Sequence, residues 1–396
     1  MKTKTGNSKF LKQMNQANIL DLIRVHGAIS RAELAETTGL SPTAVGVITS
    51  GLLKKGYIHE TGTGESSGGR RPILLGLKPD SYYTVGIDLD AGYINLLILD
   101  ITGRIVHEEN KSFDADLTFE MVLKIINKTA KVALQKLNID REKVLGIGIS
   151  IAGIVDEKNR EVLLAPNLGW ENIKLSLEPF EGLNVPLYVQ NEARCSAIAE
   201  NWLGACQGID DFVCINIRSG IGSGIFAGGK LFSGTYGSAG EIGHIIVKEN
   251  GIKCGCGNFG CLETISSTTG MVKKAKEFII LGKIQGFSRK MGFSFDDLIS
   301  AARDGDTTAI SVLDESARYL GIAISYIINI INPARVVIGK EFTKYADLVL
   351  DAIKAVVESK TLKTAVLNIS IEASSLCEKS SALGAAIIPL KVLFGR

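Results

Sequence analysis

Three cysteines and one histidine lie close together in one short segment of this chain. Cys254, Cys256 and Cys261 fall within eight residues, and His244 lies ten positions before the first of them. Three thiolates and one imidazole complete the tetrahedral shell that a structural zinc ion takes. The glycines among these cysteines let the backbone turn tightly enough to direct the sulfur atoms to one point. The sequence therefore predicts a zinc site formed by these four side chains.

A disulfide bond with one thiol left free is the alternative use of the clustered cysteines. The N-terminal segment MKTKTGNSKF is basic, but no apolar signal segment follows it. Clustered thiols in a protein that is not secreted favour a metal over a disulfide. We therefore expect bound zinc and a cytoplasmic location. The other four cysteines are scattered through apolar segments, at Cys195, Cys206, Cys214 and Cys377.

The composition is that of a soluble α/β protein with more than one domain. A chain of 396 residues is too long for a single core, and it is 45% hydrophobic and 22% charged. The longest apolar stretch, 320–331, is interrupted by Ser325 and Asn329 and is typical of a buried helix. We expect no association with a membrane.

Residues 1–78 differ in charge from the rest of the chain. They contain eleven Lys and Arg against five Asp and Glu, whereas the remainder contains 33 basic and 37 acidic residues. A basic head joined to a mildly acidic body favours a polyanionic partner for the head.

The head contains three short helical patterns. The first covers 18–25, the second begins after a capping box of Ser30 and Glu33, and the third covers 43–55. Gly39 lies in the short turn between the second and third helices. Two helices joined in this way form a helix-turn-helix, whose second helix would enter the major groove of DNA.

The outward face of the third helix and the segment after it are the candidate DNA contacts. Strands expected at 57–61 and 73–77 would form a wing, with Arg70 and Arg71 placed for phosphates or a minor groove. A small protein-interaction module is the alternative, but the wing and the positive charge favour operator DNA. The expected contacts from the helix are small and uncharged: Ser41, Thr43, Ala44, Gly46, Val47 and Ser50.

Strand and helix patterns alternate from residue 79 onward. Strands are expected at 85–89, 94–101 and 144–151, and a long helix at 307–331. This order predicts two α/β lobes with a ligand cleft between them. We expect 79–190, with a closing helix in 380–396, to form one lobe, and 191–379 to form the other.

The phrase GSAGEIGHIIV (237–247), followed by the cysteine cluster ending in CLE, resembles the signature of the ROK family of sugar-responsive repressors and sugar kinases. The resemblance implies an actin-like, sugar-kinase type ATPase fold over about 79–396. Residues 1–78 resemble the winged head of ROK repressors. His244 is assigned to the metal first and to the sugar second, and Gly153 and Trp170 are expected from the resemblance to shape the pocket. The sugar contacts implied by the resemblance are Asn167, Asn191, Glu192, Glu241, His244 and Glu263.

The same resemblance shows departures from the ROK kinases. Asp90-Ala91 replaces the Gly-Gly of their first phosphate loop, and Arg218-Ser219 stands where the second begins. Lys340-Glu341 replaces two glycines near the adenine and would crowd that surface. Asn191-Glu192 replaces Asn-Asp, which moves the catalytic carboxylate outward, and a misplacement of about 1 Å can cost about a hundredfold in rate.

These departures favour sensing over catalysis. We expect a sugar-responsive transcriptional repressor, not an enzyme, whose effector belongs to the xylose or glucose class. Its symmetrical operator would be read by a homodimer or homotetramer. The alternative is a sugar kinase with an appended DNA-binding head.

Overall fold

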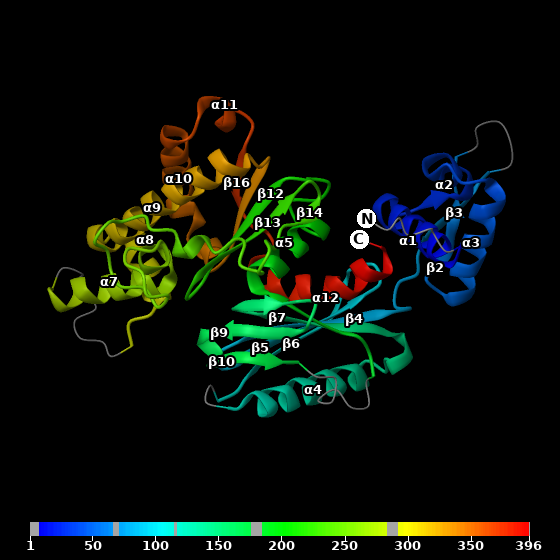
Figure 1. Cartoon of the computed structure of the whole chain (residues 1–396), viewed down its shortest axis with the longest axis horizontal. Helices are drawn as coiled ribbons and strands as arrows, with labels where there is room; N and C mark the ends of the chain where they lie inside the picture. Colours follow the sequence, from blue (N-terminus) through cyan, green and yellow to red (C-terminus); the bar gives the residue numbers. More distant parts are fainter. Residues whose placement is uncertain (1–7, 66–70, 115–116, 176–183, 283–291, 396) are drawn as a thin grey trace. The chain divides into compact units, whose positions relative to one another are not determined.

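The computed structural model describes residues 8–65, 71–114, 117–175, 184–282 and 292–395, which form two compact units (Figure 1). The first comprises Met1–Ile149, Lys174–Val189 and Ala385–Arg396, and the second comprises Ser150–Ile173 and Gln190–Gly384. The first unit includes both the head and most of the expected first lobe. The expected domain boundaries at 78, 190 and 379 stay predictions.

The head contains the three expected helices and the wing. Its elements are α1 (Ser8–His26), β1 (Ile29–Ser30), α2 (Arg31–Thr38), α3 (Pro42–Lys55), β2 (Ile58–Thr63) and β3 (Ile73–Leu77). The first helix is longer than predicted, because only its second half carries the buried Ile19, Leu20 and Ile23 on which the prediction rested. The three strands form one sheet in the order β1-β3-β2, and the short β1 was not predicted.

The predicted capping interactions define the ends of the head helices. The Ser30 hydroxyl accepts a hydrogen bond from Glu33 N at 3.2 Å, and the Glu33 carboxylate accepts one from Ser30 N at 2.8 Å. Ser41 caps α3 by accepting from Ala44 N at 3.2 Å. Gly39 has a φ of 67°, which ends α2 in the left-handed region. The capping box and the helix-turn-helix are therefore confirmed.

A five-stranded sheet in the order β11-β7-β4-β5-β6 follows the head. Figure 1 shows α4 (Phe119–Lys136) on one face of this sheet and α12 (Ser380–Leu393) on the other. The helix α12 packs closely on β7, since a Cβ at Gly148 would lie 1.9 Å from the carbonyl of Ala385. The strands are β4 (Tyr83–Asp90), β5 (Tyr93–Asp100), β6 (Ile105–Ser112), β7 (Val144–Ile151) and β11 (Leu187–Asn191).

The second unit is built on another five-stranded sheet, in the order β14-β13-β12-β15-β16. Its strands are β12 (Phe212–Ile217), β13 (Ile221–Ala227), β14 (Lys230–Leu231), β15 (Arg335–Lys340) and β16 (Ser370–Ala373). A smaller sheet contains β8 (Ile154–Asp156), β9 (Glu161–Ala165) and β10 (Trp170–Lys174). The helices are α5 (Glu192–Trp202), α6 (Glu263–Ser266), α7 (Thr268–Ile280), α8 (Phe295–Arg303), α9 (Thr307–Ile331), α10 (Ala346–Lys360) and α11 (Lys363–Val366).

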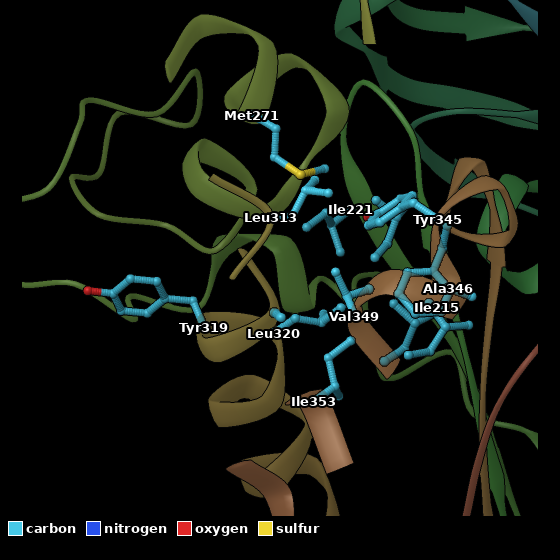
Figure 2. Close-up of a cluster of buried hydrophobic side chains, with 14 of the residues drawn as sticks. Ile215, Ile221, Met271, Leu313, Tyr319, Leu320, Tyr345, Ala346, Val349 and Ile353 are labelled. Carbon is cyan, nitrogen blue, oxygen red and sulfur yellow. The ribbon is translucent and has the colours of Figure 1, made fainter. Parts of the chain in front are cut away.

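The hydrophobic core of the second unit includes residues near the ends of β12, β13 and β15. Figure 2 shows Met271 of α7, Leu313 of α9 and Ile221 of β13 pointing toward one another. Each fully buried aliphatic side chain contributes about 1.5–3 kcal/mol relative to an exposed one. The parallel pairing of β12 with β15 places Ile217 beside Lys340. The residues that follow β12 and those that end β15 are therefore neighbours.

The expectations for the body agree closely with these elements, and α9 and β7 have the predicted bounds. Among the described residues, no helix combines the length and the apolar character needed to cross a membrane.

Candidate functional site

The predicted metal ligands lie together around the cysteine-rich segment. The ligand atoms of His244, Cys254, Cys256 and Cys261 are all within 4.8 Å of one another. His244 Nδ1 is 3.6 Å from Cys254 Sγ, and Cys256 Sγ is 3.7 Å from Cys261 Sγ. Tetrahedral zinc bonds of about 2.0 Å to nitrogen and about 2.3 Å to sulfur separate two such ligand atoms by about 3.5–3.8 Å. The four side chains therefore fit a metal ion.

Two glycines give the cysteine segment its shape. Gly260 has a φ of 74°, and a Cβ there would lie 1.8 Å from the carbonyl of Lys248. Gly257 has a φ of 97°, which an L-residue rarely adopts. Gly255 does not have a positive φ and a Cβ there meets no atom within 4 Å, so the role predicted for the glycines holds for only two of them.

The thiols of the cluster differ in their acidity. Burial raises the pKa of the Cys254 and Cys261 thiols, whereas hydrogen bonding from the backbone N–H of Asn258 lowers the pKa of Cys256. A metal ion binds the thiolate form, so binding at this cluster releases protons. The alternative of a disulfide is not observed, since all seven cysteines are free thiols.

Asn191 and Gly153 connect the start of α5 to the loop after β7. Asn191 is the N-cap of α5, accepting a hydrogen bond from Arg194 N at 3.1 Å, and its Nδ2 donates to the carbonyl of Gly153 at 2.9 Å. A Cβ at Gly153 would lie 2.3 Å from the carbonyl of Leu164, so the position requires glycine. The side chain of Asn191 thus fixes the position of the next residue, Glu192.

Glu192 lies between two cations. Its Oε1 is 3.7 Å from an Arg218 Nη and 3.5 Å from Lys340 Nζ. The Lys340 side chain is 0% exposed, and its Nζ also donates to the carbonyl of Glu378 at 3.0 Å. The Lys340 side chain is thus buried beside Glu192, and its expected effect on an adenine surface stays a prediction.

Glu263 lies between the metal cluster and the glycine-rich turn after β12. Its Oε2 accepts a hydrogen bond from Ile221 N at 3.1 Å, and its Oε1 is 3.9 Å from Cys254 Sγ. A Cβ at Gly220 would lie 2.7 Å from the same carboxylate. The cluster and the turn that carries Arg218 are therefore joined through one side chain.

Glu241 and Arg194 interact electrostatically. Burial raises the pKa of Glu241, and the nearby His244 and Arg194 oppose that increase. Arg194 is 2% exposed, and its Nη2 donates to the carbonyls of Ser233, Gly237 and Ala239. Arg194 was not among the predicted site residues, although a charged residue within an apolar helix pattern was a signal.

Asn167 lies in a short turn that follows β9. It is exposed in the 3-10 turn Pro166–Leu168, and no hydrogen bond or ion pair within the described chain joins it to the other candidate sugar contacts. Trp170 is buried at 6% exposure, which is compatible with a structural role. The structure thus brings Glu241, His244 and Glu263 together and links Glu192 to them through the turn that carries Arg218.

Asp88 and Asp90, at the position of the first phosphate loop of the kinases, make contacts within the hairpin of β4 and β5. The Asp90 carboxylate accepts a hydrogen bond from Ala91 N at 2.8 Å. Asp88 is 1% exposed, and Tyr93 Oη lies 3.5 Å from its Oδ2. Both carboxylates therefore take part in the structure of this hairpin. Glu341, also expected to crowd the adenine surface, pairs with Lys344 at 2.6 Å.

The candidate DNA-reading face of α3 is largely accessible. Ser41, Thr43, Val47 and Ser50 are exposed, and Ala44 and Gly46 are half-buried. The opposite side is held by Thr49, which donates to the carbonyl of Val45 at 2.8 Å and accepts from Arg31 Nε at 3.2 Å. Arg71 of the wing is exposed, and Arg70 lies outside the described residues.

Comparison with known proteins covers both parts of the chain. Residues 84–392 match the model of the ROK family, and residues 15–59 match a winged helix-turn-helix DNA-binding model. The chain is 31% identical over 382 residues to the xylose repressor of Caldicellulosiruptor bescii, covering 96% of each chain. It is 29% identical over 393 residues to the DNA-binding transcriptional dual regulator NagC of Escherichia coli K12, covering 98% of this chain and 96% of NagC.

A solved structure is similar over the same length. A ROK family transcriptional regulator, described as a homologue of the E. coli MLC protein, superposes with a TM-score of 0.86 at 28% identity and covers 97% of each chain. The predicted fold, a winged helix-turn-helix followed by an actin-like sugar-kinase fold, is confirmed by these matches.

Proposed function

Because the chain belongs to the ROK family and begins with a winged helix-turn-helix, we propose that it is a transcriptional repressor whose affinity for operator DNA responds to a sugar. The observation that carries this proposal is the similarity to a xylose repressor over 96% of both chains, which includes the head as well as the body. The names of the relatives favour an effector of the xylose or N-acetylglucosamine class.

The head would bind the operator. The exposed hydroxyls of Ser41, Thr43 and Ser50 and the methyl groups of Val47 are suited to hydrogen bonds and apolar contacts with base edges. Arg71, with Arg70, would neutralise phosphates beside the groove. Ala44 and Gly46 would allow the helix to approach the bases closely. A homodimer would match the two halves of a symmetrical operator.

The sugar would bind among the polar residues around the start of α5 and the metal cluster. We propose Asn167, Asn191, Glu192, Glu241, His244 and Glu263 as its contacts. Carboxylates and amides can bind pairs of neighbouring hydroxyls, as a sugar requires. His244 has one ring nitrogen, Nδ1, directed toward the cysteines, so Nε2 is the atom proposed for the sugar.

Zinc is the metal that the four ligands favour, because closed shells of three cysteines and one histidine are typical of structural zinc sites. When bound, it would supply a crosslink between the turn that contains His244 and the segment that contains the three cysteines. The residues themselves position Glu263, whose carboxylate lies 3.9 Å from Cys254 Sγ. The proposed role is therefore to keep the effector site in shape.

We propose that the body does not phosphorylate the sugar. Glu192, at the position of the kinase base, has its carboxylate paired with two cations, since its Oε1 lies 3.7 Å from an Arg218 Nη and 3.5 Å from Lys340 Nζ. A sugar kinase with a DNA-binding head is the competing function.

The test begins with operators selected from a random pool of duplex DNA. The full chain should retain a defined sequence, and xylose or N-acetylglucosamine should change its affinity for that sequence. Failure to enrich any sequence would remove the repressor function. The competing function would instead be established if the protein released ADP from Mg-ATP in the presence of either sugar at about 1–100 per second, the range typical of kinases.

A further inference from the structure

Lys340 has a backbone conformation that lysine rarely adopts. It ends β15 with φ 62° and ψ −137°, a region populated almost only by glycine. Its side chain is 0% exposed, although lysine is seldom fully buried without a partner. Both the backbone strain and the loss of hydration oppose this arrangement, so the contacts of the ammonium group must compensate for them.

The contacts of Lys340 lead to a single carboxylate. Its Nζ is 3.5 Å from Glu192 Oε1 and 3.0 Å from the carbonyl of Glu378. Arg218, in the turn after β12, places a guanidinium nitrogen 3.7 Å from the same Oε1. The side chains of Glu192 and Arg218 are each 13% exposed. Two separate segments of the second unit therefore place cations beside one carboxylate oxygen that belongs to a third segment.

The position of Glu192 in its helix adds to this arrangement. It is the first residue of α5, an eleven-residue helix whose N-terminus favours a negative charge. The hydrogen bonds of Asn191 to Gly153 and Arg194 fix the backbone there. With the backbone fixed, the two cations contribute to the direction of the Glu192 carboxylate.

We propose that Lys340 and Arg218 are positioning residues of the effector site, which hold Glu192 as a correctly directed, ionised carboxylate that accepts a hydrogen bond from a sugar hydroxyl. This inference rests on the proposed sugar response. An ionised carboxylate is only an acceptor, so the ligand must offer a donor at this point. The ligand class is a neutral sugar with a free hydroxyl facing Glu192.

The competing explanation is that the three charges only stabilise the fold. A double-mutant cycle separates the two explanations, because a residue that acts through Glu192 loses its effect when Glu192 is already neutral. Lys340→Met removes the charge and keeps the length of the side chain, and Glu192→Gln removes the negative charge. Lys344→Met is the matched control, because Lys344 pairs with Glu341 at 2.6 Å and lies in the segment after β15.

The measurement is calorimetric titration of the full, zinc-loaded chain with D-xylose, D-glucose and N-acetyl-D-glucosamine. Lys340→Met should weaken binding about tenfold, as expected for a loss of about 1.4 kcal/mol. In the Glu192→Gln background the same change should have no further effect. Lys344→Met should bind like the wild type. Equal losses from Lys340→Met in both backgrounds would overturn the proposal.

Arg218 provides the second variant in case Lys340→Met does not fold. Arg218→Gln should weaken binding and Arg218→Lys should restore most of it, again only when Glu192 is present. Unchanged affinity in Arg218→Gln would overturn the proposal. If the wild type binds none of the three sugars, the proposed effector function fails and the inference falls with it. Binding with additive losses overturns the inference alone.

Discussion

Arg194 Nη2 donates a hydrogen bond of 2.6 Å to the carbonyl of Gly237. The same nitrogen lies within 3.3 Å of the carbonyls of Ser233 and Ala239, so one buried guanidinium holds the loop that leads to Glu241. Arg194 lies two residues after Glu192 on α5. The helix that carries one candidate sugar contact therefore fixes the loop that carries others.

Replacing Arg194 by Met should disorder this loop. Buried hydrogen bonds to a charged group are each worth about 1.5–3 kcal/mol, and three carbonyls would lose their donor. We expect a lower thermal midpoint and effector binding weakened by tenfold or more, measured by calorimetry. Arg303→Met is the control, because Arg303 makes an exposed ion pair with Asp347 at 2.8 Å, a type worth about 0–1 kcal/mol. Equal effects of the two substitutions would contradict the role of Arg194.

Loss of the metal should affect the sensor before it affects the head. Elemental analysis should find about one zinc ion per chain in the wild type, as a single closed four-ligand site predicts. Cys261→Ser should abolish it, because its buried thiol is one of the four ligands. Cys377→Ser should retain the metal, since Cys377 is an exposed thiol outside the cluster.

The functional consequence can be measured on the same proteins. Operator affinity without sugar should be preserved in Cys261→Ser, because the head has its own core around Ile19, Leu20 and Ile23. The change in operator affinity on adding sugar should be lost, because Glu263 and His244 are no longer held. A normal sugar response from metal-free protein would show that the cluster does not support the effector site.

Glu200 should make stability depend on pH. It is 0% exposed, and burial raises its pKa, whereas hydrogen bonds from the Ser374 hydroxyl and from Ala205 N oppose the shift. The nearby Glu372 raises the pKa further and Arg335 lowers it. Since the native pKa is above the ordinary one, the unfolded chain loses its proton first as the pH rises. The contribution of Glu200 to the free energy of unfolding should therefore be fully present below about pH 4.5. It should be lost as the pH rises through the native pKa.

Glu200→Gln should remove this contribution. The slope of unfolding free energy against pH changes by at most about 1.4 kcal/mol per pH unit for one proton. Thermal midpoints measured from pH 4 to pH 8 should fall less steeply in Glu200→Gln than in the wild type. Glu358→Gln, at an exposed position on α10, should leave the slope unchanged. A wild-type slope in Glu200→Gln would mean that Glu200 takes up no proton in the native state.

Arg71 of the wing should contribute to DNA binding through its charge on a phosphate, and not through recognition of the base sequence. Arg71→Ala should weaken operator binding and lower the slope of log affinity against log salt by about 0.9, the value for one phosphate contact. Val47→Ala, on the exposed face of α3, should instead change which sequences are preferred and leave the salt slope as it is. These outcomes can be separated by fluorescence anisotropy over a series of salt concentrations. If Arg71→Ala keeps both affinity and slope, the wing does not contact DNA.

Local interactions account for what could be predicted from the sequence. The capping box of Ser30 and Glu33 and the left-handed Gly39 involve residues at most a few positions apart, so they can be recognised without the fold. The four metal ligands lie within one short segment, which makes their convergence predictable from spacing. The strands of the body were predicted for a similar reason, because continuous apolar runs indicate buried strands.

The tertiary structure decided the features that depend on distant segments. The two-residue β1 exists because Ile29 pairs with Leu75, and nothing in its own sequence requires a strand. Arg194 reaches three carbonyls that lie about forty positions away in the chain. Lys340 meets Glu192 because β12 and β15, more than a hundred residues apart, pair in parallel with Ile217 beside Lys340. The sequence by itself determined the ROK fold, the head and the four candidate metal ligands, whereas only the packing of distant segments decided which charges surround Glu192.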